Sequence, residues 1–154
     1  MKNLSQEEKN QLYKAPLLVC LLIAGADDNI DNNEISESIR QAKENAKRSE
    51  SFLFKFYNEI ARDFKERLKK ILDEYPAHAA ERNPLLIKEL SGLNNILAKT
   101  DKTFSIVYYN SLKEIAARIA KSSGGIMGIH AISAEEKAYI DLPMINDPSK
   151  LFHK

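Results

Sequence analysis

The sequence predicts an all-α fold, a compact single-domain bundle of about six or seven helices. Apolar residues recur at three- and four-residue steps along most of the chain, and no segment alternates apolar and polar residues as a half-buried strand would. Glycine and proline number five each and stand at the ends of the periodic segments. A chain of 154 residues suits one domain with one core.

Residues 5–26 are expected to form two helices. Ser5 and Glu8 have the spacing of a capping box, in which each side chain accepts a hydrogen bond from a backbone N–H group at the start of a helix. This helix should end near Tyr13. Pro16 suits the first turn of a second helix, where its missing N–H would be unpaired in any case. Because residues 17–26 are apolar or small throughout, the second helix should be central and packed on all sides.

A third, more polar helix is expected after residue 31. Asp31 and Glu34 repeat the capping-box spacing, and Ile30 stands where a hydrophobic staple would. Apolar residues then follow at helical spacing, namely Ile35, Ile39, Ala42 and Ala46.

Residues 52–72 hold a helical period with one apolar side. That side consists of Leu53, Phe56, Ile60, Phe64, Leu68 and Ile71. The other faces mix basic and acidic residues, whereas a nucleic-acid-binding stripe needs clustered charge of one sign. We therefore expect a solvated charged face here.

Pro76 and residues 77–82 are expected to form a connection, with room for one short turn. Asn83 then serves as a cap and Pro84 as the first residue of the next helix. The buried side of this helix consists of Leu86, Leu90, Leu93 and Leu97. A further helix begins near residues 101–103. Its inward residues are Phe104, Val107, Tyr108, Leu112, Ile115 and Ile119.

The last part of the chain combines a glycine-containing loop, a short helix and a tail. Residues 122–125 read SSGG and end the preceding helix. Ser133 and Glu136 form a third capping box, which opens a final short helix. Residues 1–143 are accordingly expected to form the helical domain, and residues 144–154, which show no clear period, a C-terminal tail.

Charge and cysteine content exclude several classes of protein. Lysine and arginine number 23 against 22 aspartate and glutamate residues, so the net charge of +1 gives no reason to expect a nucleic acid or an anionic membrane as partner. Cys20 is the only cysteine, so neither an intrachain disulfide nor a thiolate metal cluster can form. We expect it to be a small buried hydrophobe.

The N-terminal apolar segment is expected to be a core helix rather than a secretory signal or a membrane span. Glu7 and Glu8 interrupt the basic region that a signal requires, and Pro16 opens the apolar run instead of closing it. Residues 17–26 are too few to cross a bilayer as a helix. We therefore expect no membrane span and a cytoplasmic location.

Residues 26–34 hold the most distinctive chemistry of the chain. They read ADDNIDNNE, which places three Asp, three Asn and one Glu in one turn between helices. Carboxylate and amide oxygens are ligands of hard cations such as Ca²⁺ and Mg²⁺. An EF-hand is excluded, because starting it at Asp27 puts Asn32 where glycine belongs and Ser38 where the bidentate glutamate belongs. The alternative is a structural turn whose acids cap a helix or face solvent.

A later region of the chain repeats part of this pattern. An isoleucine, a cap residue and a glutamate stand in the same frame at residues 30–34 and at residues 132–136, each time after an apolar helix and a polar loop. These residues resemble the TerB family, which is named for tellurite-resistance proteins and includes the N-terminal domain of the J-protein DjlA. Its first loop reads Ala-Asp-Gly-x-Ile-x-x-x-Glu, from which this chain departs only at Asp28. Many members also carry an Ala-Ser-Gly-Gly loop followed by Ile/Val-Ser-x-Glu-Glu, and residues 121–136 are similar to it.

The resemblance implies a helical domain with two pseudo-repeated halves, in which acids of the two loops converge on a divalent metal ion. Carried over by position, Asp27 and Glu34 are the acids of the first repeat and Glu136 is the acid of the second. Asp28 replaces a glycine, and we expect it either to add a ligand or to adopt the left-handed backbone that glycine would. The second loop has no Asp matching Asp27, which speaks against a symmetric two-ion site.

The sequence thus predicts a non-enzymatic TerB-like domain that binds a divalent metal ion and a protein partner, with a role in a tellurite-type stress response. No set of nucleophile, base and orienting acid is recognisable, so we assign no catalysis. The expected metal ligands are Asp27, Asp28, Glu34 and Glu136. The alternative is a protein-interaction or dimerisation module without a metal, monomer or homodimer, whose acidic loops serve only as helix caps.

Overall fold

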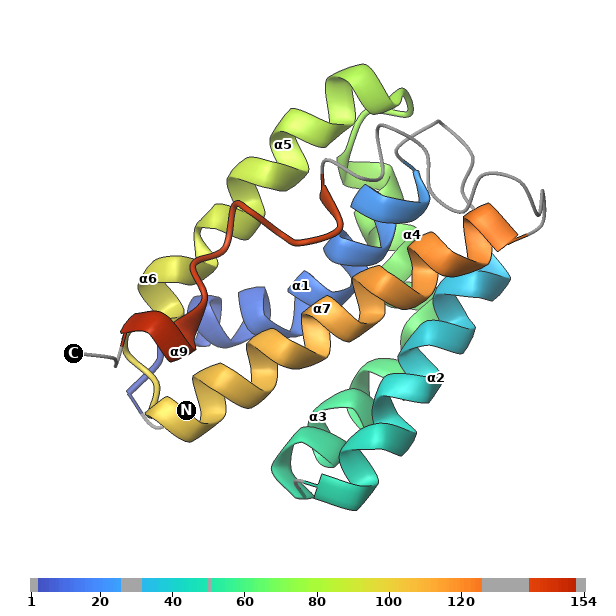
Figure 1. Ribbon diagram of the computed structural model, residues 1–154. Helices are drawn as coiled ribbons and strands as arrows, with labels where there is room; N and C mark the ends of the chain where they lie inside the picture. Colours follow the sequence, from blue (N-terminus) through green and yellow to red (C-terminus); the bar gives the residue numbers. More distant parts are fainter. Residues whose placement is uncertain (1–2, 26–31, 50, 126–138, 152–154) are drawn as a thin grey trace.

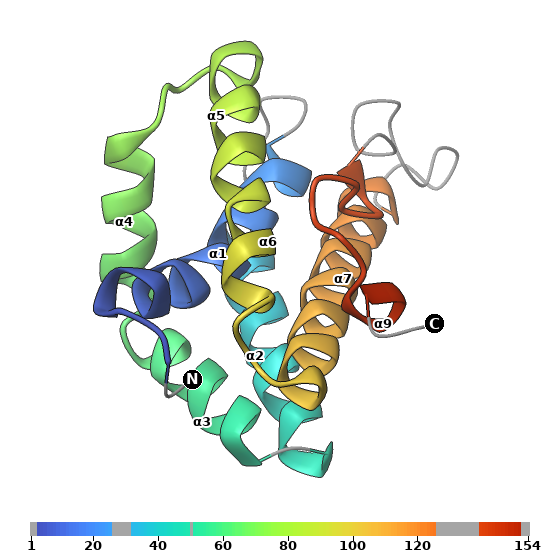
Figure 2. The ribbon, with the colours of Figure 1, turned by 90° about the vertical axis from the view of Figure 1, so that its left-hand side faces the viewer.

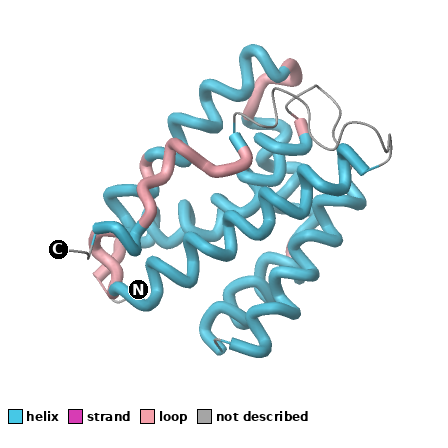
Figure 3. The backbone as a smooth tube through the Cα atoms, viewed as in Figure 1, coloured by secondary structure: helices cyan, strands magenta, loops and turns pink. Residues whose placement is uncertain are grey.

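The chain folds as a bundle of α-helices (Figures 1 and 3). The computed structural model describes residues 3–25, 32–49, 51–125 and 139–151, which form helices and connecting turns without a strand. The predicted all-α class is confirmed. The described helices are α1 (Gln6–Ala24), α2 (Asn32–Ser49), α3 (Ser51–Arg62), α4 (Phe64–Glu74), α5 (Ala79–Ser91), α6 (Leu93–Leu97), α7 (Lys102–Gly125) and α9 (Pro148–Leu151).

Helix α1 is the central element of the bundle. It packs against α2, α4, α5, α6 and α7, and Figure 2 shows it running between α4 on one side and α7 on the other. Residues 17–24 are all buried, as expected for a segment that is apolar on every face. At its start, Glu8 N donates to Ser5 Oγ at 3.1 Å and Ser5 N donates to Glu8 Oε1 at 2.9 Å, which confirms the predicted capping box.

The prediction of two helices within residues 5–26 is wrong, because α1 passes through Pro16 without a break. A proline inside a helix removes the N–H group that would bond to the carbonyl four residues earlier, which here belongs to Leu12. The hydroxyl group of Tyr108, on α7, donates a hydrogen bond of 2.7 Å to that carbonyl. Leu12 and Tyr108 are both fully buried. A tertiary contact therefore replaces the missing helical hydrogen bond.

Helices α2 and α3 pack against each other, and α2 also packs against α7. The apolar residues predicted to face inward on α2, namely Ile35, Ile39, Ala42 and Ala46, are all buried. The expected staple and cap, Ile30 and Asp31, lie outside the described residues. Between α3 and α7, the hydroxyl groups of Tyr57 and Ser111 share a buried hydrogen bond of 2.7 Å.

The helical period over residues 52–72 is divided between two helices. α3 ends at Arg62 and α4 begins at Phe64, with Asp63 between them at φ −106° and ψ 24°. The predicted apolar side is confirmed, because its members are buried or, at Phe64, partly buried. The break allows α4 to pack against α1 as well as against α3.

Helix α5 begins earlier than the sequence predicts. Residues 77–82 are not all connection, because α5 begins at Ala79 and contains Pro84. Asn83, the expected cap, is instead buried within the helix. The carbonyl that loses its partner at Pro84 belongs to Ala80, and Ala80 is exposed. Ala80 and Pro84 both lie on the exposed side of α5, so the proline is tolerated inside the helix.

The buried sides predicted for the later helices are confirmed. Those of α5 and α6 are Leu86, Leu90, Leu93 and Leu97. On α7 every predicted inward residue is buried except Val107, which is partly buried. Asp101 caps α7, since its Oδ1 accepts a hydrogen bond of 2.8 Å from the backbone N–H of Phe104.

The described part of the C-terminal segment packs onto the bundle. Leu142 and Ile145 are buried, and α9 contacts α7. Asn94 of α6 bonds to this segment twice: Nδ2 donates to the carbonyl of Met144 at 3.1 Å, and Oδ1 accepts from the N–H of Asn146 at 2.8 Å. Most of the final helix predicted from residue 133 lies outside the described residues.

Candidate functional site

Of the four predicted metal ligands, the structure describes Glu34, in the first turn of α2, where it is half-buried. Asp27, Asp28 and Glu136 lie outside the described residues. Over the ranges that are described, no group of three or more His, Cys, Asp or Glu side chains is arranged to hold a metal ion. The metal site formed by both loops therefore stays a prediction.

The described helix ends that flank the two acidic loops lie at one end of the bundle. α1 and α7 pack against each other and run in similar directions, so their C-terminal ends are neighbours (Figure 1). α2 packs against α7 and begins at the same end. Residues 26–31 connect α1 to α2, and residues 126–138 follow α7. The two loop sequences thus join the fold at neighbouring helix ends.

Helix dipoles make this end of the bundle favourable to positive charge. The carbonyl groups at the C-terminal ends of α1 and α7 carry partial negative charge, whereas the N-terminal end of α2 carries partial positive charge. Because two C-terminal ends and one N-terminal end meet here, their summed partial charge is negative and favours a cation. Among the described residues, one cation at this end is the side chain of Arg82.

Arg82, on α5, holds the C-terminal end of α1. Arg82 is 2% exposed. Nη2 donates a hydrogen bond of 2.6 Å to the carbonyl of Gly25, and Nη1 donates one of 2.8 Å to the carbonyl of Ala77. Hydrogen bonds from a charged donor are stronger than neutral ones, and a helix C-terminus favours a cation. Because Gly25 directly precedes the first acidic loop, Arg82 fixes the point at which that loop begins.

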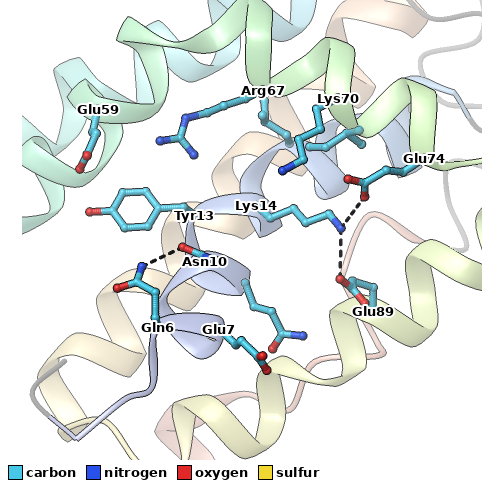
Figure 4. Close-up of a pocket in the computed structure, with 13 residues that line it drawn as sticks. Gln6, Glu7, Asn10, Tyr13, Lys14, Glu59, Arg67, Lys70, Glu74 and Glu89 are labelled. Atoms are coloured by element: carbon cyan, nitrogen blue, oxygen red, sulfur yellow. Dashed lines mark hydrogen bonds and ion pairs between the residues drawn. The ribbon is translucent and has the colours of Figure 1, made fainter.

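A groove with a volume of about 620 Å³ lies mainly between α1 and α4, with one residue from α5 (Glu89) and one from α3 (Glu59) completing its lining (Figure 4). The cations that line it are Lys14, Arg67 and Lys70. The carboxylates that line it are Glu7, Glu59, Glu74 and Glu89. The groove is therefore polar and carries both signs of charge.

Lys14 joins the two walls of this groove. Its ammonium nitrogen lies 3.2 Å from Glu74 Oε2 on α4 and 3.3 Å from Glu89 Oε1 on α5. Burial opposes the charge of Lys14, but hydrogen bonds with Tyr75 and Glu74 and the negative charge of Glu89 outweigh it and raise the pKa of Lys14. Lys14 therefore stays protonated, and its charge is already matched within the protein.

Arg67 and Tyr13 form the opposite part of the groove. The guanidinium carbon of Arg67 lies 5.5 Å from the centre of the Tyr13 ring, a cation–π contact. Its Nη2 lies 3.9 Å from Asp63 Oδ2, too far for a hydrogen bond, and its buried Nε has no hydrogen-bond partner among the described residues. Burial, together with a hydrogen bond to Glu59, raises the pKa of Tyr13. The guanidinium of Arg67 thus keeps hydrogen-bonding capacity that the described protein groups do not use.

Neither the contact of Arg82 with Gly25 nor the groove could be predicted from local patterns in the sequence. Arg82 stands in a segment predicted to be a connection, and nothing in its neighbours marks it as buried. Arg67 and Lys70 were expected to belong to a solvated charged face. Lys70 is exposed as expected, whereas Arg67 is half-buried, because α1 packs against this side of α4. Both features depend on contacts between distant segments.

Three ionisable groups in the described part of the core have raised pKa values because they are buried. Cys20 is fully buried, which confirms the interpretation of this residue as a small hydrophobe. Burial raises the pKa of the Cys20 thiol, so it remains protonated at neutral pH. Burial likewise raises the pKa of Tyr57 and of Tyr108.

Comparison of the chain with protein-family models, with curated proteins and with solved structures gives no significant match. Among the described helices, none combines the length and the apolar character needed to cross a membrane.

Proposed function

We propose that this chain is a non-enzymatic TerB-like helical domain that binds a divalent cation of the Ca²⁺ or Mg²⁺ class through its two acidic loops, as part of a tellurite-type stress response. Asp27, Asp28 and Glu34 are the ligands from the first loop, and Glu136 is the ligand from the second. The observation that supports this proposal is the common end of the bundle at which α1, α2 and α7 flank both loop sequences.

The ligand chemistry suits a hard cation rather than a soft one. Carboxylate oxygens prefer Ca²⁺ and Mg²⁺, and Ca²⁺ takes about six to eight oxygen ligands. A single short loop without an EF-hand register offers too few of them, so a second loop has to contribute. The C-terminal end of α7 adds favourable partial charge, whereas the C-terminal end of α1 already binds the guanidinium of Arg82 through the carbonyl of Gly25.

The proposal assigns no reaction to the protein. Catalysis needs an accessible nucleophile or base with a suitably shifted pKa. The thiol of Cys20 is buried, and its raised pKa keeps it protonated. A binding role requires no such group.

Isothermal titration calorimetry with Ca²⁺, Mg²⁺ and Mn²⁺ tests the cation site. We expect saturable binding to the unmodified chain, and a loss of at least about tenfold, or 1.4 kcal/mol, in Asp27→Asn combined with Glu34→Gln. The matched control is Glu66→Gln, which removes an exposed acid from α4. Absence of saturable binding, or equal affinity in the double variant, means that the loops do not form a cation site.

A second candidate function is a protein-interaction or dimerisation module without a metal. Phe52 is 37% exposed, and its ring centre lies 5.4 Å from that of Phe104. Both rings line an apolar groove of about 570 Å³, together with Tyr13 and Phe56. Exposed apolar patches with polar rims are typical of protein contacts. In this function the acidic loops act only as helix caps.

A further inference from the structure

We propose that the groove between α1 and α4 binds a short peptide through its free ends, with the carboxylate at Arg67 and Lys70 and the ammonium group toward Glu7. This site uses none of the predicted metal ligands and does not depend on the proposed cation site. Its volume of about 620 Å³ lies within the range of about 300–1,000 Å³ that is usual for small-molecule sites.

The anion-binding half of the site is on α4. Arg67 and Lys70 are three residues apart, so they lie on one face of the helix, and both reach into the groove (Figure 4). Lys70 makes no ion pair within the described part of the chain. The only ion-pair contact of Arg67 with the described residues is the 3.9 Å one with Asp63, and its guanidinium also lies over the ring of Tyr13. A planar guanidinium beside a lysine is a typical carboxylate-binding arrangement.

The cation-binding half lies across the groove on α1. Figure 4 shows Glu7 on the side of the groove away from Lys70. Glu7 makes no ion pair with the described residues, in contrast to Glu74 and Glu89, which share the ammonium group of Lys14. Glu59, the other carboxylate of the lining, lies 3.8 Å from Arg62 and accepts a hydrogen bond from Tyr13. The groups that remain for a ligand are therefore positive on α4 and negative at Glu7.

This distribution of charge selects among ligand classes. Four carboxylates in the lining disfavour a nucleic acid or another polyanion. The aliphatic residues of the groove are Leu17 and Ile71. They offer too little apolar surface to bind the apolar face of a partner helix. A small zwitterion meets both charges at once. Gln6, Asn10 and Gln11 add amide groups that can bond to peptide groups between the two ends.

Titration of the ¹⁵N-labelled chain with triglycine, followed by NMR chemical shifts, tests the proposal. We expect saturable shifts of backbone amides on α1 and α4, with a Kd of about 1 mM or tighter. Acetylation of the amino end or amidation of the carboxyl end should each weaken binding at least about tenfold. No saturable shift with triglycine, or equal binding of inorganic phosphate, would overturn the zwitterion site.

Variants assign each end of the peptide to its side of the groove. Arg67→Gln combined with Lys70→Gln should abolish discrimination between triglycine and its amide, whereas Glu7→Gln should abolish discrimination between triglycine and its acetylated form. If these residues acted only in folding, the variants would bind triglycine and its blocked forms with the same relative affinities as the unmodified chain does. The control is Lys69→Gln, because Lys69 lines a different groove, with Asn32. Undiminished discrimination in both variants contradicts the proposal.

Discussion

The hydroxyl group of Tyr108 lies inside the bundle against the backbone of α1. Its hydrogen bond of 2.7 Å to the carbonyl of Leu12 satisfies the acceptor that Pro16, four residues later, leaves without a helical partner. A buried carbonyl without any partner is costly, because it loses water on folding and gains nothing in return. One side chain of α7 therefore allows α1 to remain a single helix.

Removal of this hydroxyl in Tyr108→Phe is expected to lower the free energy of unfolding by about 1–3 kcal/mol, because the carbonyl of Leu12 stays buried without a partner. Urea unfolding followed by circular dichroism measures the change. Tyr109→Phe is the control, since the hydroxyl of Tyr109 makes no hydrogen bond with the described residues. Tyr109→Phe should lower the free energy of unfolding much less than Tyr108→Phe does.

A double-mutant cycle separates this cause from a general loss of packing. Pro16→Ala supplies the N–H group that can bond to the carbonyl of Leu12 within the helix. The cost of Tyr108→Phe should therefore be smaller in the Pro16→Ala background than in the unmodified chain. An equal cost in both backgrounds would show that the carbonyl is not the reason.

At the scale of the element, the start of α1 combines a local motif with one distant contact. Ser5 and Glu8 form the capping box, and Lys99, from the turn after α6, forms an ion pair with Glu8. The hydrogen bond to Lys99, followed by that to the backbone of Ser5, lowers the pKa of Glu8. The ionised form of Glu8 therefore binds its partners in the folded chain.

The capping box is expected to make stability depend on acid pH. Because the folded pKa of Glu8 is lowered, its contribution is complete above the ordinary carboxyl pKa and is lost as the pH falls through the folded value. Between about pH 7 and about pH 3, the unmodified chain should therefore lose more unfolding free energy than Glu8→Gln does. Urea midpoints at both pH values measure this difference.

The neighbouring Glu7→Gln serves as the control for that experiment. Glu7 is outside the capping box, and it makes no hydrogen bond with the backbone of Ser5. This variant keeps the capping box, so it should lose more stability with acid than Glu8→Gln does. If Glu8→Gln loses as much unfolding free energy with acid as the unmodified chain does, the ionised capping box contributes no pH dependence.

Helix existence could be predicted from the sequence more reliably than helix limits. The inward sides of α2 and α7 follow from local periodicity, since residues three and four apart share one face. Asp63 ends α3 although the apolar period continues through it. Pro84 suggests a helix start, yet α5 begins at Ala79. Local signals show where a helix can begin or end, and packing decides whether it does.

At the scale of the whole molecule, the cation site and the interaction surface predict different melting behaviour. With Ca²⁺ or Mg²⁺ at about 100 times its Kd, the free energy of unfolding should rise by about 2.7 kcal/mol, because the cation binds the folded chain only. EDTA should reverse the rise. Thermal melting by circular dichroism measures it, and Asp27→Asn with Glu34→Gln should show none.

Sedimentation velocity completes this comparison. If EDTA and added cations leave the melting temperature unchanged while the chain sediments as a dimer that Phe52→Ser dissociates, the interaction module is the correct function. If the chain is monomeric and cations raise the melting temperature, the cation-binding domain is supported.

The sequence by itself determined the all-α class, the buried side of each long helix and the capping box at Ser5 and Glu8. These depend on residues within one or two helical turns, which the chain order already brings together. It also singled out Asp27, Asp28, Glu34 and Glu136, whose common site stays a prediction.

Only the tertiary structure decided which helices meet, and with that the features that join distant segments. Tyr108 reaches Leu12 and Arg82 reaches Gly25 across separations that no local pattern encodes. The groove lined by Lys14 and Arg67 exists because α4 and α5 both pack against α1. Such contacts follow from how apolar helix faces fit together in three dimensions, so the spacing of residues along the chain does not specify them.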